Sequence, residues 1–204
     1  VRTVRASGLS VEAVDCGGGL GISYRNEVEG QPEALAGAIR AELGGLGLRL
    51  SIEPGRWPIG PAGVLLSSVI LRKEEGLPGP FLVLDAAMND MVRPSMYDAW
   101  HGLVPLAPQA FSQPVAPTHV VGPVCESGDT FARGRLLPPL GRASRMAILD
   151  TGAYGAVMSS TYNSRPLAAQ VLVENGQWTV IRRRQTLEEL WQDEAMPAPP
   201  NGKA

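Results

Sequence analysis

The sequence predicts an α/β segment followed by an all-β domain. Three observations predict this. A strand, a glycine turn, a helix and a second strand follow one another between residues 11 and 53. Beyond Ala62 the sequence pattern changes to short runs of β-forming residues that are separated by Pro and Gly. Near the end, Asn175-Gly176 lies between two such runs, as in a tight hairpin. We therefore divide the chain into residues 1–62, residues 63–192 and a disordered tail over residues 193–204.

The α/β segment begins with a short buried strand at Val11–Asp15, followed by the glycine-rich turn "CGGGLGI". Apolar residues then recur at helical spacing from Pro32 to Leu43, where Gly44-Gly45 ends the helix. A second buried strand runs from Leu48 toward Glu53. One and a half β/α units fall far short of a closed eight-stranded barrel and leave open edges. Either another polypeptide segment completes this layer, or the native protein is longer at its N-terminus.

The β-rich part predicts an antiparallel barrel or sandwich, because its strands are short and its turns frequent. Asn175-Gly176 favours a type I′ turn. Thr186–Trp191 is predicted as a short helix with a capping box of Thr186 and Glu189, and the tail from Met196 as disordered. The predicted strands are Val64–Leu71, Phe81–Leu84, His119–Val124, Arg145–Leu149, Ala168–Val173 and Trp178–Arg183.

Composition excludes several classes of function. A net charge of −2 without a basic block argues against nucleic-acid and membrane-surface binding, and no apolar stretch approaches the roughly 20 residues of a membrane helix. Cys16 and Cys125 show neither a disulfide pattern nor zinc-site spacing, and His101 and His119 are the only histidines. We therefore expect a cytoplasmic protein without a metal site.

The stretch "LRLSIEPGRWPI" carries the strongest chemical signal. Glu53, Gly55 and Arg56 place a carboxylate, a bare amide and a guanidinium at one strand end, where parallel sheets bind ligands. The alternative is a surface turn with a local ion pair. The glycine turn at Gly17–Gly19 fails the dinucleotide motif because Ile22 occupies the third glycine position. Its amides could still bind phosphate, or the turn could be a flexible loop.

Three further clusters lie in the β-rich part. Arg93 and Tyr97 are four residues apart and could face one anionic group. Cys125 and Glu126 place a thiol and a carboxylate after an apolar strand, and Tyr154 stands between small residues. Taken singly, each also fits a structural role: a surface ion pair, a small core residue and a packing aromatic.

Together, the motifs GGGLGI, EPGR, RPxxYDAWH, GPVCESGD and GAYGxxMSSxYNSRP resemble the C-terminal half of the diaminopimelate decarboxylase family. The resemblance implies a fold-type III enzyme that depends on pyridoxal 5′-phosphate (PLP). Residues 1–62 would then be the last strands and helices of an incomplete (β/α)8 PLP-binding barrel, and the β-barrel or sandwich domain would follow. It also implies a homodimer with shared active sites that converts meso-diaminopimelate to lysine and carbon dioxide.

The resemblance assigns roles to individual residues. Cys125 would donate a proton to the carbanion in the neighbouring subunit, and Glu126 would bind the distal ammonium of the substrate. Glu53 would hold the pyridine nitrogen protonated, which makes the ring a stronger electron sink. The implied cofactor-binding residues are Gly17, Gly18, Gly19, Glu53, Gly55, Arg56 and Tyr154, and the implied substrate-binding residues are Arg56, Arg93, Tyr97, Glu126 and Tyr154.

One departure from the family pattern concerns lysine. The family binds its cofactor to a lysine in the N-terminal half, whereas this sequence has only Lys73 and Lys203, neither in a family motif. We therefore expect the chain alone to bind PLP poorly and to be inactive. Two alternatives stay open: a decarboxylase for ornithine, arginine or carboxynorspermidine, and a non-catalytic truncated homologue that pairs with an intact subunit.

Overall fold

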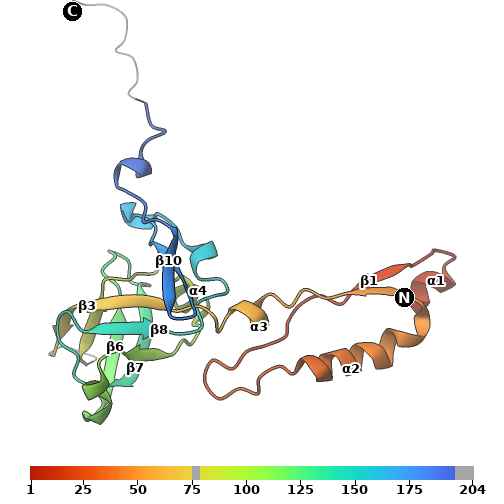
Figure 1. Cartoon of the computed structure of the whole chain (residues 1–204), viewed down its shortest axis with the longest axis horizontal. Helices are drawn as coiled ribbons and strands as arrows, with labels where there is room; N and C mark the ends of the chain where they lie inside the picture. Colours follow the sequence, from red (N-terminus) through yellow and green to blue (C-terminus); the bar gives the residue numbers. More distant parts are fainter. Residues whose placement is uncertain (75–78, 196–204) are drawn as a thin grey trace, which may run out of the picture.

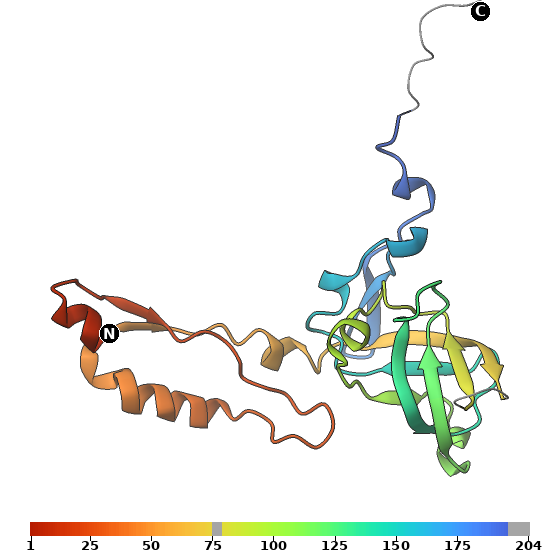
Figure 2. The same cartoon turned by 180° about the vertical axis from the view of Figure 1, so that it is seen from behind.

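The computed structural model describes residues 1–74 and 79–195. An extended arm, residues 1–59, carries helix α1 (Arg2–Ala6) and the parallel strands β1 (Ala13–Asp15) and β2 (Arg49–Ser51), which are joined through helix α2 (Pro32–Leu43). Figures 1 and 2 show this arm reaching away from the rest of the molecule. The predicted strand–helix–strand order is confirmed. The prediction that both strands are buried is wrong, because two strands and one helix cannot cover both faces of a sheet.

A six-stranded sheet forms the second region, the sheet domain, over residues 60–151. Its strand order is β5-β8-β3-β4-β6-β7, and Figures 1 and 2 show the sheet curling around one core. Helix α3 (Arg56–Ile59) leads into it, and helix α4 (Arg93–Tyr97) contacts its edge strand β7. The strands are β3 (Leu65–Lys73), β4 (Phe81–Leu84), β5 (Leu103–Pro105), β6 (Ala116–Val121), β7 (Thr130–Leu137) and β8 (Arg145–Ile148).

The sheet is mixed, so the prediction of a purely antiparallel domain is wrong. β4 pairs with β6 in parallel, with Phe81 opposite His119, whereas the other neighbouring pairs are antiparallel. The chain between these two strands carries α4 and β5, which is long enough for the crossover that a parallel pair requires. Two strands, β5 and β7, were not predicted. Pro105 and Gly134 interrupt their patterns, and Gly134 has a φ of +58°.

The contiguous hydrophobic core of the described residues lies within the sheet domain. Leu82 and Leu84 alternate along β4 and are fully buried. They pack with apolar residues from all five remaining strands of the sheet. Burying this continuous cluster gives the sheet domain its own source of stability. The core cluster contains Val69, Leu82, Leu84, Ala86, Met91, Leu103, Ala110, Val120, Phe131, Leu137, Leu140, Met146 and Ile148.

The C-terminal hairpin forms a separate two-stranded sheet of β9 (Gln170–Glu174) and β10 (Gln177–Arg182). Asn175 and Gly176 have φ values of +50° and +74°, so the predicted hairpin turn with two left-handed residues is confirmed. The side-chain carboxylate of Glu189 accepts the Thr186 N–H at 2.8 Å, as in the predicted capping box, although the helix shortens to a 3-10 turn at Glu188–Leu190.

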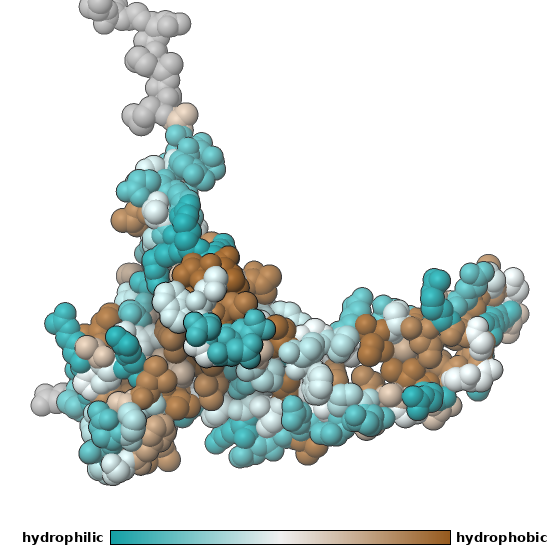
Figure 3. All heavy atoms as spheres, viewed as in Figure 1, coloured by the Kyte–Doolittle hydropathy of each residue, from teal (hydrophilic) through white to brown (hydrophobic). Residues whose placement is uncertain are grey.

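Apolar surface remains open on the arm, where Leu50 and Ile52 are exposed (Figure 3). No helix in residues 1–74 and 79–195 is long and apolar enough to cross a membrane. The predicted tail from Met196 lies outside the described residues. Further 3-10 turns lie at Gly44–Leu46, Pro108–Ser112, Ala156–Met158 and Tyr162–Ser164.

Candidate functional site

The two turns that follow β1 and β2 are bonded to each other. Gly17 N–H donates to Asp15 Oδ1 at 2.7 Å, and its carbonyl accepts the Glu53 N–H at 2.8 Å. A Cβ on Gly18 would overlap the Glu53 carbonyl oxygen, so only glycine fits at this position. The parallel pairing of β1 and β2 brings both turns to the same end of the sheet. The triple-glycine turn and the Glu53–Arg56 turn therefore form one structure.

A cavity of about 290 Å³ opens between these turns. Of the predicted cofactor residues, it brings together all but Gly17. Arg56 lies on its wall, with its guanidinium carbon 5.5 Å from the centre of the Tyr154 ring. The cavity is lined by Gly18, Gly19, Leu20, Gly21, Glu53, Gly55, Arg56 and Tyr154.

The backbone around Tyr154 holds its ring at this cavity. Tyr154 itself has a φ of +59°, a left-handed conformation that is costly for a bulky residue. A Cβ on Gly152 would overlap the Ile59 carbonyl oxygen, and one on Gly155 would overlap the Thr151 carbonyl oxygen. The close packing of these glycines fixes the segment and offsets the strain. Residues with a strained backbone conformation concentrate at binding and active sites, which is consistent with a binding role for Tyr154.

Unused hydrogen-bond donors make the cavity suitable for an anion. Within the described part of the chain, the N–H groups of Gly18 and Gly19 donate to no protein acceptor. Arg56 Nε is buried and also lacks a partner among the described residues. The Gly55 N–H, in contrast, already donates to the Glu53 carbonyl at 2.8 Å. Two bare amides and an unpaired guanidinium N–H can together bind a phosphate group.

Arg93 is not part of this cavity lining. It is buried in a cluster with the buried His101 and the half-buried Tyr24. Its Nη1 donates to Tyr24 Oη at 2.9 Å and to His101 Nε2 at 3.0 Å. His101 must then carry its proton on Nδ1, which faces the Leu149 carbonyl at 2.8 Å. Burial, opposed by that hydrogen bond, lowers the pKa of His101. Tyr97, predicted to share an anion with Arg93, is 60% exposed at the end of α4.

Cys125 and Glu126 lie on an exposed turn between β6 and β7, and they do not line the cavity. The Glu126 carboxylate accepts the Gly128 N–H at 3.1 Å and the Tyr162 hydroxyl at 3.3 Å. The negative charge of Glu126 raises the pKa of Tyr162. Each carboxylate oxygen of Glu126 thus accepts one hydrogen bond, which fixes the orientation of the carboxylate.

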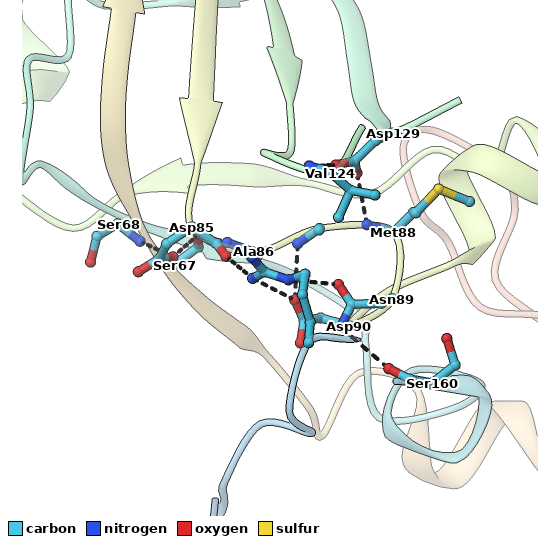
Figure 4. A network of polar contacts seen from close by, with 12 residues as sticks. Ser67, Ser68, Asp85, Ala86, Met88, Asn89, Asp90, Val124, Asp129 and Ser160 are labelled. Carbon is cyan, nitrogen blue, oxygen red and sulfur yellow. Dashed lines mark hydrogen bonds and ion pairs between the residues drawn. The ribbon is translucent and has the colours of Figure 1, made fainter. Parts of the chain in front are cut away.

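A buried polar network ties this turn to the rest of the sheet domain (Figure 4). Asp129 accepts backbone N–H groups from two loops, and Arg165 donates to Asn89 Oδ1 at 3.0 Å. We did not predict roles for Tyr24, His101, Asp129 or Tyr162. His101, Asp129 and Tyr162 lie within the motifs RPxxYDAWH, GPVCESGD and GAYGxxMSSxYNSRP, so the motifs contained them, although spacing alone gave them no role. Residues 1–74 and 79–195 contain no group of three His, Cys, Asp or Glu side chains placed to bind a metal.

Comparison with known proteins confirms the expected resemblance. The family model described as "Pyridoxal-dependent decarboxylase, C-terminal sheet domain" matches residues 14–152. Diaminopimelate decarboxylase from Zymomonas mobilis is 44% identical over 95% of this chain and 46% of that protein. The crystal structure of diaminopimelate decarboxylase from Helicobacter pylori complexed with L-lysine superposes with a TM-score of 0.85 at 39% identity, over 94% of this chain and 46% of that chain. The chain thus spans less than half the length of these relatives. Since the family model matches well over half of the chain, the chain belongs to the pyridoxal-dependent decarboxylases that carry this sheet domain.

Proposed function

We propose that this chain forms the C-terminal part of a PLP-dependent enzyme that decarboxylates meso-diaminopimelate to lysine. The cavity between the glycine turn and the Glu53–Arg56 turn carries this proposal, because six of the seven predicted cofactor residues line it. Relatives named diaminopimelate decarboxylase at about 40% identity support the choice of substrate. The division into residues 1–62 and 63–192, with the first part completing a (β/α)8 barrel, agrees with the open edges of the arm.

The residues of the cavity fit the phosphate and the ring of PLP. The free amides of Gly18 and Gly19 and the unpaired Arg56 Nε would bind the phosphate, and Glu53 would bind the pyridine nitrogen. When bound, PLP supplies an electron sink for the carbanion left by carbon dioxide. The Tyr154 ring, held by its glycine neighbours, would close one side of the cavity and exclude water.

Substrate recognition requires groups that distinguish the two amino-acid ends of diaminopimelate. In our proposal, Arg93 and Tyr97 bind a carboxylate, and Tyr24 and His101 hold the Arg93 guanidinium in place. Glu126 binds the distal ammonium, because its two oxygens are already oriented by Gly128 and Tyr162. Charges of both signs at a fixed separation would select a substrate with two such ends.

The position of Cys125 supports a shared active site. Cys125 and Glu126 are exposed on the β6–β7 turn and contribute nothing to the lining of the cavity in their own chain. They could therefore serve the cavity of a second subunit, with Cys125 donating a proton there. We propose a cytoplasmic homodimer in which each sheet domain completes the partner's site.

Three measurements test the proposed function. Intact-mass analysis of the source protein should give a mass about twice that of the chain, given that relatives extend to more than double its length. That protein should release carbon dioxide from meso-diaminopimelate faster than from ornithine, arginine or carboxynorspermidine.

Glu126→Gln should raise KM chiefly for diaminopimelate by roughly tenfold, as expected for a lost charge-assisted hydrogen bond. An unchanged KM would remove Glu126 from the substrate site.

The 204-residue chain alone provides a further test. Among its described residues, Lys73 lies at the end of β3 and does not line the cavity. Borohydride reduction of the chain mixed with PLP should therefore leave Lys73 unlabelled. Stoichiometric labelling of Lys73 would contradict the view that the cofactor lysine lies elsewhere.

A further inference from the structure

Asp129 is a buried carboxylate that joins two loops of the sheet domain. It is 3% exposed. Its Oδ1 accepts the Met88 N–H at 2.7 Å, and its Oδ2 accepts the Val124 N–H at 2.9 Å (Figure 4). Both carboxylate oxygens are thus bonded to backbone groups, one on each loop. A side chain with two acceptor oxygens is needed to satisfy both donors from this position.

The backbone of Asp129 closes the turn that carries Cys125 and Glu126. Its N–H donates to the Glu126 carbonyl at 3.0 Å, and its carbonyl accepts the Gly122 N–H at 3.1 Å. Together with the side-chain bond to Val124, these bonds fix the turn on both sides of Cys125. A Cβ on Gly122 would overlap the Asp129 carboxylate, so the fit between these two residues is close.

The loop on the other side of Asp129 is itself held rigidly. Asn89 exchanges hydrogen bonds with Ser160, since Asn89 Nδ2 donates to the Ser160 carbonyl at 3.3 Å and the Ser160 N–H donates to the Asn89 carbonyl at 2.9 Å. Arg165 donates to Asn89 Oδ1 at 3.0 Å and to the Asp85 carbonyl at 2.5 Å. This frame also leads to Tyr162, whose hydroxyl donates to Glu126. Asp129 therefore fastens the Cys125–Glu126 turn to a fixed frame.

We propose that Asp129 is a positioning residue that sets where the Cys125 thiol and the Glu126 carboxylate stand relative to the substrate. The inference rests on the proposed function in one respect, namely that these two side chains act on the substrate. A purely structural need for Asp129 would be met by any group that stabilises the sheet domain. The bonds of Asp129 instead converge on the short turn that presents the two groups. Displacing that turn by about 1 Å would reduce turnover greatly without unfolding the domain.

Asp129→Asn tests the proposal on the chain itself, with Asp90→Asn as a matched control. Asn keeps one acceptor and turns an NH2 group toward the second backbone N–H, so one bond is lost. Asp90 lies in the same loop as Met88 and is bonded to the Ala87 N–H and Arg165. By amide hydrogen exchange, D129N should speed exchange at Met88 or Val124 about tenfold while β3 and β4 stay protected. D90N should leave Val124 within about threefold of the unaltered chain.

Kinetics of the longer decarboxylase test the consequence for the reaction. D129N should lower kcat by roughly 10- to 100-fold while the protein stays folded, and D90N should change it by less than about threefold. If D129N does not fold, Gly122→Ala displaces the same carboxylate and should show both effects. Two exchange results for D129N would overturn the proposal: unchanged exchange rates at Met88 and Val124, or an equal loss of protection throughout the sheet. An unchanged kcat together with faster exchange would also overturn it. Absence of turnover in the unaltered enzyme would instead reject the proposed function, and the exchange data would still decide whether Asp129 holds the turn.

Discussion

The arm and the sheet domain both contain parallel strand pairs, yet only one of them has a core. In the arm, β1 and β2 pair in parallel, and among residues 1–59 Ile22 is the only buried apolar residue. In the sheet domain, the parallel pair β4 and β6 has a further strand on each side, and Leu82, Leu84 and Val120 are fully buried. Parallel strands are normally covered on both faces. The arm thus has the hydrogen bonding of an α/β unit without its packing, and its stability must depend on what it contacts.

The largest expected difference is between two leucines that each lie on a strand of a parallel pair. Leu84 in β4 is 0% exposed, and Leu50 in β2 is 38% exposed. Leu84→Ala should lower the free energy of unfolding of the chain by about 3 kcal/mol, because it removes buried contacts and leaves a cavity. Leu50→Ala should cost about 0.5 kcal/mol or less. Urea denaturation of both variants measures the contrast. Equal losses would mean that the arm has a core of its own.

The junction between the two regions should be the next most sensitive place. Gly152 packs against the Ile59 carbonyl and Gly63, where a Cβ would overlap backbone atoms that belong to both regions. Gly152→Ala should therefore cost about 2 kcal/mol through overpacking. Gly141→Ala is the control, because a Cβ there meets nothing within 4 Å. Thermal denaturation measures the contrast. An equal decrease in melting temperature for both variants would show that the junction is not tightly packed.

The Tyr24 contact should contribute a smaller amount to the same junction. Tyr24 belongs to the arm, and its hydroxyl accepts a hydrogen bond from the buried Arg93 of the sheet domain at 2.9 Å. Tyr24→Phe leaves that donor without its partner and should cost about 1 kcal/mol. Tyr97→Phe should change stability little, because Tyr97 is exposed at the end of α4. An unchanged free energy of unfolding in Tyr24→Phe would mean that another acceptor, in addition to His101, replaces the Tyr24 hydroxyl.

Local patterns predicted the elements that local chemistry controls. The β4 boundaries, helix α2 and the Asn175-Gly176 turn follow from alternation, helical spacing and turn residues, and the structure confirms them. The parallel pairing of β4 with β6 was missed because pairing direction depends on a crossover, which short strands and turn residues do not reveal. Strand β7 was missed because Gly134 interrupts it in a left-handed conformation.

The residues of the candidate site likewise include some that the sequence predicted and some that it did not. Strand-end reasoning grouped Glu53 with Arg56, and the family resemblance added Gly18 to them. The structure places all three at one cavity, because they follow two parallel strands that end on the same side of the sheet. The partners of Arg93 could not be predicted, because Tyr24 lies 69 positions away and no spacing rule connects them. The function of His101 as an acceptor for Arg93 likewise depends on tertiary packing. Sequence motifs therefore predicted the functional side chains, whereas long-range contacts determine which of these side chains share a site.

The smallest expected effect is a pH dependence that arises from His101. Burial lowers its pKa from 6.5, and the positive charge of Arg93, whose N–H faces Nε2, acts in the same direction. Above pH 6.5 the imidazole is neutral in both the folded and the unfolded chain, so its contribution to stability is complete there. As the pH falls through that value, the unfolded chain takes up a proton before the folded chain does, and the free energy of unfolding decreases.

His101→Gln isolates this effect, because the Gln carbonyl can still accept from Arg93 while the side chain does not titrate. The difference in unfolding free energy between the unaltered chain and this variant should shrink as the pH is lowered from about 7.5 to 5.5, a window around the reference His pKa. Urea denaturation across that range measures it, and subtraction removes the carboxylates that both chains share. If the two plots of unfolding free energy against pH are parallel, His101 titrates alike in the folded and the unfolded chain. The buried Arg93–His101 pair would then open at little cost, and the junction between the arm and the sheet domain would be weaker than its contacts imply.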